Sequence, residues 1–232
     1  MPSQRFAQGP FGVGYEQRVD IAALRNKRTA KADAQRRAAG LDALLVFKDE
    51  NCRYLTDLRP QLIAGKSTAL NGALLVEGRE PILFCSGGER DRVDRTMPWI
   101  KEAHTIPIVE EKALIDGLVK DILGPVLRKH RLVDAKIGLD EANMVFAKAL
   151  ASHFPKLNVE DGDTPMQSAR RIKLAEEIEL LEEATALADA VTASATAAVA
   201  NGVRECDVAG EAMRTLFRLG GEYAHVMTPF VA

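Results

Sequence analysis

The chain has 232 residues, of which 47% are hydrophobic, 28% are charged and 5% are aromatic, and its formal net charge is −2. This composition is typical of a soluble globular protein, and the near-neutral charge gives no basis for binding nucleic acid or an acidic membrane. Three widely separated cysteines fit a reducing compartment better than a disulfide framework: Cys52, Cys85 and Cys206. No apolar run is typical of a signal peptide or a membrane span, so the sequence predicts a cytoplasmic protein.

The first two thirds of the chain alternate between helical and strand patterns. Residues 1–20 are rich in glycine and polar residues, and we expect an extended arm there. In chain order, hydrophobic periodicity then predicts a helix at 21–39, strands at 41–47, 71–76, 81–85 and 104–109, a helix at 113–130, a strand at 136–139, a helix at 142–154 and a strand at 157–160. This alternation predicts an α/β domain with helices packed on both faces of a sheet.

Glycine and proline mark the expected breaks between these elements. Gly40 ends the first helix, and Gly78 favours a hairpin turn between the second and third strands. Pro125 lies inside the predicted helix 113–130 and predicts a kink or an earlier break. Residues 86–90 contain a Gly-Gly pair and predict a loop before a helix. Because no lysine with a following Ser or Thr occurs there, nucleotide binding is disfavoured.

Two further helices are predicted after the turn residues 161–165. The first has apolar or small residues at helical spacing, at Ile178, Leu181, Thr185, Ala188, Val191, Ala195 and Val199. It is expected to stop at Asn201-Gly202. The second places Val208, Ala212, Met213, Leu216 and Phe217 on one side and stops at Gly220-Gly221. Residues 161–165 are the predicted boundary between two domains.

The same stretch carries a resemblance to a known family. Its landmarks are Arg171-Ile172-Lys173, Glu176-Glu177-Ile178, Asn201-Gly202 with Glu205, and Gly220-Gly221-Glu222. In this order and spacing they resemble the opening of the pita-bread catalytic domain of creatinase, prolidase and aminopeptidase P. The segment Asn51 to Asp57, directly after the first predicted strand, resembles the corresponding segment of the family's N-terminal domain. One departure is Arg204, which stands where relatives usually have Thr or Ser as the helix N-cap and which cannot supply an acceptor oxygen.

The resemblance implies a fold class and a division into parts. It implies a mixed-sheet creatinase-type N-terminal α/β domain at 21–164, after the arm at 1–20. Residues 165–232 would then be the first helices of an α+β pita-bread catalytic domain, which is truncated here. In relatives the two-metal site is formed by two Asp, one His and two Glu from later strands, so we expect this chain to be an inactive fragment.

The residues themselves predict no catalytic, cofactor-binding or metal-binding site in the chain. Its histidines form no recognisable metal-ligand spacing and are each expected to be surface or packing residues: His104, His130, His153 and His225. Asp161 and Asp163 could bind a hard cation weakly, but helix capping explains them better. No nucleophile elbow is present, and Cys85 is typical of a buried small hydrophobic residue.

The functional expectation therefore comes from the resemblance. It implies that the full-length protein is a hydrolase of the aminopeptidase P or prolidase type, which cleaves peptide bonds next to proline. Two divalent ions (manganese, cobalt or zinc), a peptide or small-molecule substrate and a homodimer are implied with it. Two alternatives remain open. The parent could be a creatinase-like amidinohydrolase or a dimethylsulfoniopropionate lyase of the same fold, or the chain could be a non-catalytic assembly or gating module.

Overall fold

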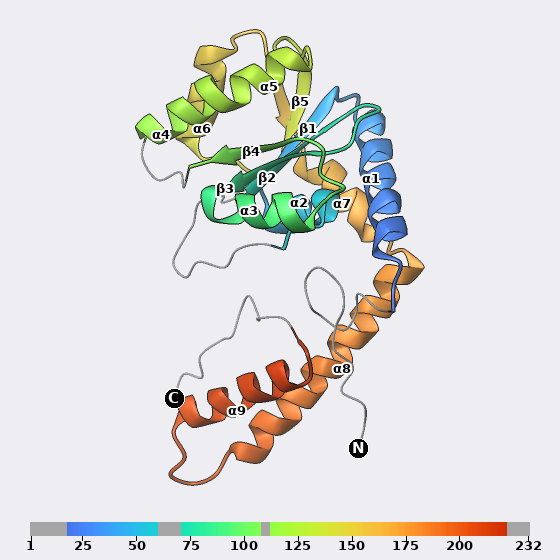
Figure 1. Ribbon diagram of the computed structural model, residues 1–232, viewed down its shortest axis with the longest axis vertical. Coiled ribbons are helices and arrows are strands. Elements are labelled where there is room, and N and C mark those ends of the chain that lie inside the picture. Colours follow the sequence, from blue (N-terminus) through green and yellow to red (C-terminus); the bar gives the residue numbers. More distant parts are fainter. Residues whose placement is uncertain (1–17, 60–70, 108–111, 222–232) are drawn as a thin grey trace. The chain divides into compact units, whose positions relative to one another are not determined.

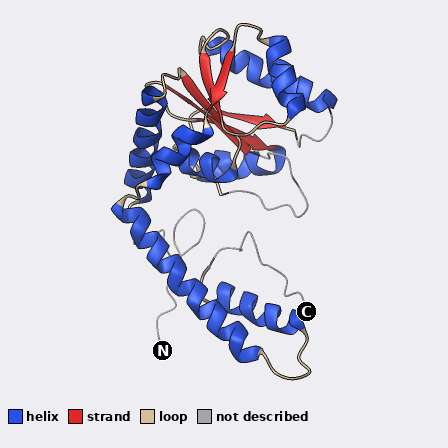
Figure 2. Cartoon of the chain, turned by 180° about the vertical axis from the view of Figure 1, so that it is seen from behind, coloured by secondary structure: helices blue, strands red, loops and turns tan. Residues whose placement is uncertain are grey.

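The structure is a computed structural model, and it describes residues 18–59, 71–107 and 112–221. Within these residues the contacts divide the chain into two compact units. One unit comprises Arg25–Ile172, and the other comprises Met1–Leu24 together with Lys173–Ala232. The first unit contains a sheet with helices on both faces, and the second contains a pair of helices (Figures 1 and 2).

The sheet of the α/β unit has six strands in the order β4-β3-β2-β1-β5-β6. The strands are β1 (Ala43–Val46), β2 (Asn71–Val76), β3 (Ile82–Ser86), β4 (Ala103–Ile106), β5 (Lys136–Leu139) and β6 (Asn158–Asp161). β2 pairs antiparallel with both β1 and β3, and the remaining pairs are parallel. The mixed sheet predicted from the sequence is therefore confirmed, with each strand within a few residues of its expected position.

Helices cover both faces of this sheet, because the central strands carry apolar side chains on both sides. One face packs against α4 (Lys112–Gly117), a π-helical turn (Leu118–Leu123), α5 (Gly124–Lys129) and α6 (Met144–His153). The other packs against α1 (Ile21–Ala38), α2 (Asp49–Thr56), α3 (Gly87–Thr96) and α7 (Asp163–Arg171). Alternate residues of β1 take opposite sides, with Leu45 in the first core and Leu44 in the second.

The predicted breaks appear where glycine and proline require them. Gly40 has φ +64° after α1, and Gly78 has φ +66° in the turn between β2 and β3. The break expected at Pro125 takes the form of the π-helical turn, in which the backbone N–H of Gly124 donates to the carbonyl of Val119. Proline has no N–H to continue the α-helical pattern, so the preceding turn widens.

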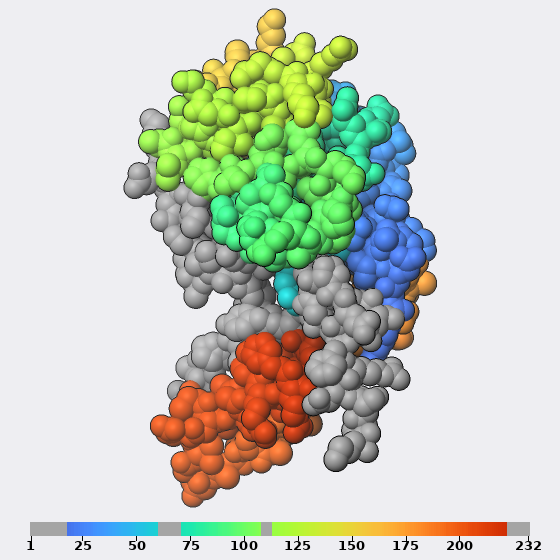
Figure 3. All heavy atoms as spheres, viewed as in Figure 1, coloured from blue at the N-terminus to red at the C-terminus, as the bar shows by residue number. Residues whose placement is uncertain are grey.

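Two local predictions were wrong. Residues 161–165 were expected to form a turn, but α7 begins at Asp163. Residues 86–90 were expected to form a loop, but α3 begins at Gly87 and only Ser86 precedes it in an extended conformation. Packing explains the difference, since Val93 and Met97 are buried in the core and tertiary contacts outweigh the weak helix propensity of glycine. Part of α3 (green) lies at the molecular surface in Figure 3.

The second unit is a helical hairpin of α8 (Ala175–Ala198) and α9 (Glu205–Arg218). Both helices and the glycine stops at Gly202 and Gly220 were predicted, and both glycines have positive φ. Val208, Ala212 and Leu216 of α9 are buried, because α8 packs against this helix. The Ser194 hydroxyl of α8 also forms a 2.7 Å hydrogen bond with the Thr215 hydroxyl of α9.

Two details of the hairpin bear on the sequence predictions. The expected apolar stripe of α8 is not uniformly buried, since Ile178 is 48% and Leu181 is 51% exposed. Arg204 precedes α9 without a side-chain cap hydrogen bond, as its chemistry requires, and its guanidinium pairs with Asp207 at 2.8 Å. This departure from the family pattern therefore leaves the start of α9 uncapped by a side-chain oxygen.

Candidate functional site

Polar side chains gather at one edge of the sheet. All strands except β2 run in the same direction, so their carboxyl ends meet at that edge. In open α/β sheets this is the edge where ligands usually bind. The residues that follow β1, β5 and β6 are therefore the first place to look for a site.

Asp140, directly after β5, is the centre of this polar edge. Its Oδ1 accepts a hydrogen bond from the backbone N–H of Phe47 at 2.7 Å. Its Oδ2 accepts hydrogen bonds from the backbone N–H of Lys48 at 3.1 Å and from the side chain of Asn51 at 2.9 Å. Burial raises the pKa of Asp140, and these hydrogen bonds work in the opposite direction. The carboxylate thus ties the end of β5 to the turn between β1 and α2.

The flanking charges are also paired. The ammonium of Lys48 lies 2.7 Å from Oδ2 of Asp163, in the first turn of α7. This hydrogen bond raises the pKa of Lys48 and lowers that of Asp163. Asp161 accepts hydrogen bonds from the backbone N–H groups of Asp163 and Thr164, at 2.8 and 3.2 Å. Asp161, which precedes the N-cap residue Gly162, therefore accepts hydrogen bonds from the first turn of α7, whereas Asp163 bonds to Lys48 and Gln167 and does not cap the helix.

Two side-chain amides at the same edge are buried; one forms a single hydrogen bond with Asp140 and the other forms none. Asn51 is 0% exposed and its Oδ1 has no hydrogen-bond partner, while Asn71 is 1% exposed and both polar atoms of its amide lack one. Neither side chain can be reached from solvent. The polar edge therefore acts as an internal clamp between strands and helices, and it does not present an open reaction site.

In the part of the chain that the structure describes, the thiols of Cys52 and Cys85 are buried. Burial raises the pKa of the Cys52 thiol to about 12, with the Thr56 hydroxyl acting in the opposite direction, and burial also raises the pKa of Cys85. Buried thiols of this kind are poor nucleophiles. Cys206 is exposed. His225 lies outside the described residues.

Of the other described histidines, two bond to carboxylates, whereas His130 is buried and neither of its ring nitrogens has a hydrogen-bond partner, Nε2 lying 3.4 Å from Glu102. Nε2 of His153 lies 2.8 Å from Asp116, and Nε2 of His104 lies 2.9 Å from Oε1 of Glu102. Glu102 also accepts a hydrogen bond from Lys129 at 2.6 Å. Burial acts to raise the pKa of Glu102, but the hydrogen bonds from Lys129 and His104 outweigh it and lower this pKa to about 2. The carboxylate therefore serves as a fixed anion between β4 and α5.

The resemblance implies a metal centre, which needs several His, Asp or Glu side chains close together. Within residues 18–59, 71–107 and 112–221, no three His, Cys, Asp or Glu side chains lie where they could hold a metal ion together. The carboxylates of the polar edge are occupied by Lys48, by amides and by backbone N–H groups. These residues do not fit a two-metal centre.

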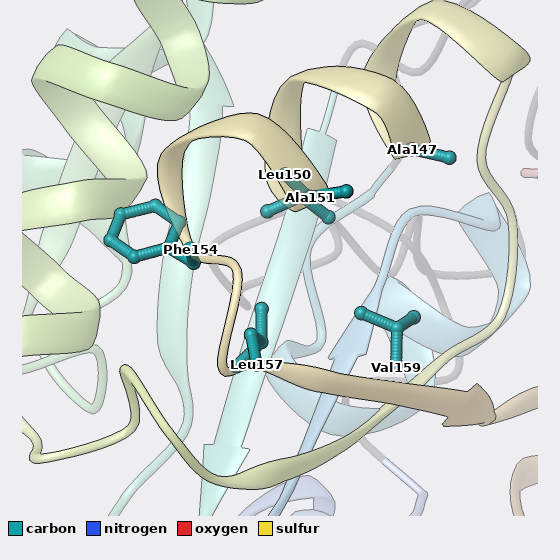
Figure 4. Close-up of a pocket in the computed structure, with 6 residues that line it drawn as sticks. All are labelled: Ala147, Leu150, Ala151, Phe154, Leu157 and Val159. Atoms are coloured by element: carbon teal, nitrogen blue, oxygen red, sulfur yellow. The ribbon is translucent and has the colours of Figure 1, made fainter.

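A small apolar hollow lies between α6 and β6. It has a volume of ≈ 170 Å³ and is lined by Ala147, Leu150, Ala151, Phe154, Leu157 and Val159. Figure 4 shows these residues on α6, on the segment that follows it and on β6. The hollow holds no polar or titratable side chain, so it offers apolar contact and no chemistry.

The sequence reasoning missed the residues that organise the polar edge. Lys48 and Asp140 were not singled out, although each stands within two residues of the end of a predicted strand. That position was the available signal, because carboxyl ends of parallel strands converge. The sequence around Asn71 does not indicate that this residue is buried, because its burial depends on the position of β2 between β1 and β3.

Across residues 18–59, 71–107 and 112–221, each helix is too short or too polar to cross a membrane.

Fold and site together define an α/β domain with a mixed sheet, helices on both faces and an internally paired polar edge, joined in sequence to a helical hairpin. The family model of the Creatinase/Prolidase N-terminal domain matches residues 28–172, which is more than half of the chain. The chain therefore belongs to the creatinase/prolidase N-terminal domain family. A search of curated proteins found no match.

Solved structures show the same fold over a longer stretch. The prolidase from Pyrococcus horikoshii OT3 is 18% identical with a TM-score of 0.59, covering 82% of this chain and 48% of that chain. An Xaa-Pro dipeptidase from Bacillus anthracis is 16% identical with a TM-score of 0.59, covering 84% and 49%. The dipeptidase PepE from Mycobacterium ulcerans is 21% identical with a TM-score of 0.56, covering 85% and 50%. This chain thus spans about half the length of these structures.

Proposed function

We propose that this chain is the N-terminal part of a metal-dependent peptidase that hydrolyses peptide bonds next to proline. The observation that carries the proposal is the extent of the structural likeness. It covers 82% of the chain against the Pyrococcus prolidase, whereas the family model alone matches residues 28–172. The likeness therefore covers more of the chain than the family model does.

In this proposal the described residues provide a scaffold and the chemistry comes from elsewhere in the full-length protein. The donor set of the described residues does not fit a metal centre, so the ligands for two divalent ions would be outside them. The buried, free thiols of Cys52 and Cys85 fit a reducing, cytoplasmic setting.

The test compares two proteins on two substrates. The 232-residue chain and the protein encoded by the complete reading frame are each assayed with manganese, cobalt or zinc against an Xaa-Pro dipeptide. A matched Xaa-Ala dipeptide reports selectivity for proline, and a chelator reports dependence on metal. We expect metal-dependent, proline-selective hydrolysis by the complete protein and no turnover above the metal-only blank by the 232-residue chain.

Three other results would redirect the assignment. Turnover by the 232-residue chain would show that it contains an active site which the described residues do not reveal. A complete protein that binds metal but hydrolyses no Xaa-Pro dipeptide would favour the amidinohydrolase or lyase alternative. Loss of the downstream Asp, Asp, His, Glu, Glu series would favour a non-catalytic assembly or gating module.

A further inference from the structure

Two Asn-Gly pairs occur in the chain, and the structure places them in opposite surroundings. Asn201-Gly202 lies in the turn between α8 and α9, where both residues are exposed. Asn71-Gly72 lies at the start of β2, where both residues are buried and the strand pairs with β1 on one side and with β3 on the other. The same dipeptide is therefore present once in solvent and once in the core.

The backbone around Gly202 is open to solvent. Gly202 has φ +84°, and the N–H of Val203 donates to the carbonyl of Ala200 at 3.2 Å, as in a type II turn with glycine in the third position. A Cβ at Gly202 would meet no atom within 4 Å. Among the described residues, the N–H of Gly202 and the side-chain amide of Asn201 form no hydrogen bond. Neither group is held in place by a partner.

An asparagine side chain and the backbone nitrogen that follows it can react with each other. The nitrogen can approach Cγ of the asparagine and close a five-membered ring with the main chain. A side chain on the following residue hinders this approach, whereas glycine has no Cβ and moves between backbone conformations at little steric cost. An exposed Asn-Gly pair in a turn therefore combines the reactive groups with the freedom to meet.

We propose that Asn201 is a site of spontaneous deamidation, which converts the turn between α8 and α9 into a mixture of aspartate and isoaspartate. A bond forms between the nitrogen of Gly202 and Cγ of Asn201, and the bond from Cγ to Nδ2 breaks. Nδ2 leaves as ammonia and takes the proton that the Gly202 nitrogen loses. Water is the co-reactant that then opens the succinimide ring at either of its carbonyls, and the oxidation state of each carbon is unchanged.

The two products differ in their main chain. Opening of the ring at Cγ leaves aspartate with the original backbone, whereas opening at the main-chain carbonyl routes the backbone through Cβ and Cγ as isoaspartate. Either product adds one negative charge to the formal net charge of −2. Isoaspartate also adds one main-chain atom between Ala200 and Val203, so the 3.2 Å hydrogen bond that closes the turn loses its geometry. We expect the start of α9 to become less stable in this form.

Asn71 carries the same reactive groups without the freedom to use them. It is 1% exposed, and a Cβ at Gly72 would lie 2.7 Å from the ring of Phe47, so the folded strand leaves no room for ring closure. Asn71 can react only when β2 opens. The inference is independent of the peptidase assignment, because it uses only the chemistry and surroundings of these residues.

A third asparagine separates the effect of exposure from the effect of glycine. Asn158 is exposed, but Val159 follows it, and the branched side chain of valine hinders approach to its own backbone nitrogen. Nδ2 of Asn158 also donates to Glu160 at 3.2 Å. We therefore expect Asn158 to react slowly although it is in contact with solvent.

Peptide mapping by mass spectrometry tests the site. The folded 232-residue chain is kept in mildly alkaline buffer made with isotopically labelled water, and each asparagine is followed over time. We expect Asn201 to react at least about a hundredfold faster than Asn71, because β2 must open first. It should react at least about tenfold faster than Asn158 and incorporate one labelled oxygen. In urea, which exposes both Asn-Gly pairs, Asn71 and Asn201 should react at similar rates.

Two variants separate the reaction from its consequence. Asn201→Gln lengthens the side chain by one methylene group and should abolish the product at this position. Asn201→Asp supplies the charge with a normal backbone. By native-state hydrogen exchange, the amides at the start of α9 should exchange at least about threefold faster in the isolated isoaspartate form than in Asn201→Asp.

The possible results distinguish the site from its effect. No product at Asn201 in the folded chain, or a rate there equal to that of Asn71 or Asn158, would overturn the proposed site. Equal hydrogen exchange of α9 in the isoaspartate form and in Asn201→Asp would overturn the proposed effect on the turn.

Discussion

Replacing Asp140 tests whether the polar edge of the sheet is a structural clamp. The carboxylate accepts hydrogen bonds from two backbone N–H groups and from the amide of Asn51, at 2.7, 3.1 and 2.9 Å. Asp140→Ala leaves all three donors without their acceptor. A buried donor without a partner costs about 1–3 kcal/mol, and water can reach part of this half-buried site. We therefore expect a loss of about 2–4 kcal/mol in the free energy of unfolding.

The expected loss of stability does not come from the negative charge of Asp140. Burial raises the pKa of Asp140, so its charge is disfavoured by the surroundings and the loss comes from the donors left behind. Asp140→Asn keeps the shape and one acceptor oxygen. The Asn51 amide could also turn to present its unpartnered Oδ1. The asparagine variant should therefore lose less stability than the alanine variant.

Urea unfolding followed by tryptophan fluorescence measures this change directly. Trp99 is the single tryptophan of the chain, and its indole N–H donates to the carbonyl of Thr56 at 2.9 Å. Its signal therefore reports the α/β unit. Glu141→Ala is the matched control, since this neighbouring carboxylate is exposed and its loss should change stability by less than about 0.5 kcal/mol. A loss below about 1 kcal/mol for Asp140→Ala would refute the clamp.

Two further predictions use the same fluorescence assay. Gly162→Ala would place a Cβ 2.5 Å from the carbonyl carbon of Gly138, so we expect a loss of about 3 kcal/mol or more. At Gly117 a Cβ would lie 3.9 Å from the Asp121 carboxylate, so Gly117→Ala should raise the free energy of unfolding by up to about 1 kcal/mol. Similar effects of the two substitutions on stability would contradict the close approach of Gly162 to Gly138. Glu102 has its pKa lowered from 4.5 to about 2 in the folded state, so its contribution is present above the unfolded value and lost as pH falls toward the folded one. Glu102→Gln should cost about 1–2 kcal/mol near pH 5 and much less near pH 2.5, and a pH-independent cost would show that the charge is not responsible.

The sequence alone determined the class of fold and most element positions. Periodicity and glycine stops placed β5 at Lys136–Leu139 and α9 within one residue of its end, because these signals depend on neighbours along the chain. The short motifs in the sequence also predicted the creatinase/prolidase family, and the family model that matches residues 28–172 confirms this prediction.

The tertiary structure decided which side chains meet and which surfaces stay open. Asp140 reaches Phe47 and Lys48 from more than ninety positions away because β5 lies beside β1 in the sheet, and no local pattern encodes that neighbour. Pairing order also buries Asn71 and leaves Val159 at an edge. Strand periodicity shows only that side chains alternate, whereas strand order decides which of them face a core, a clamp or solvent.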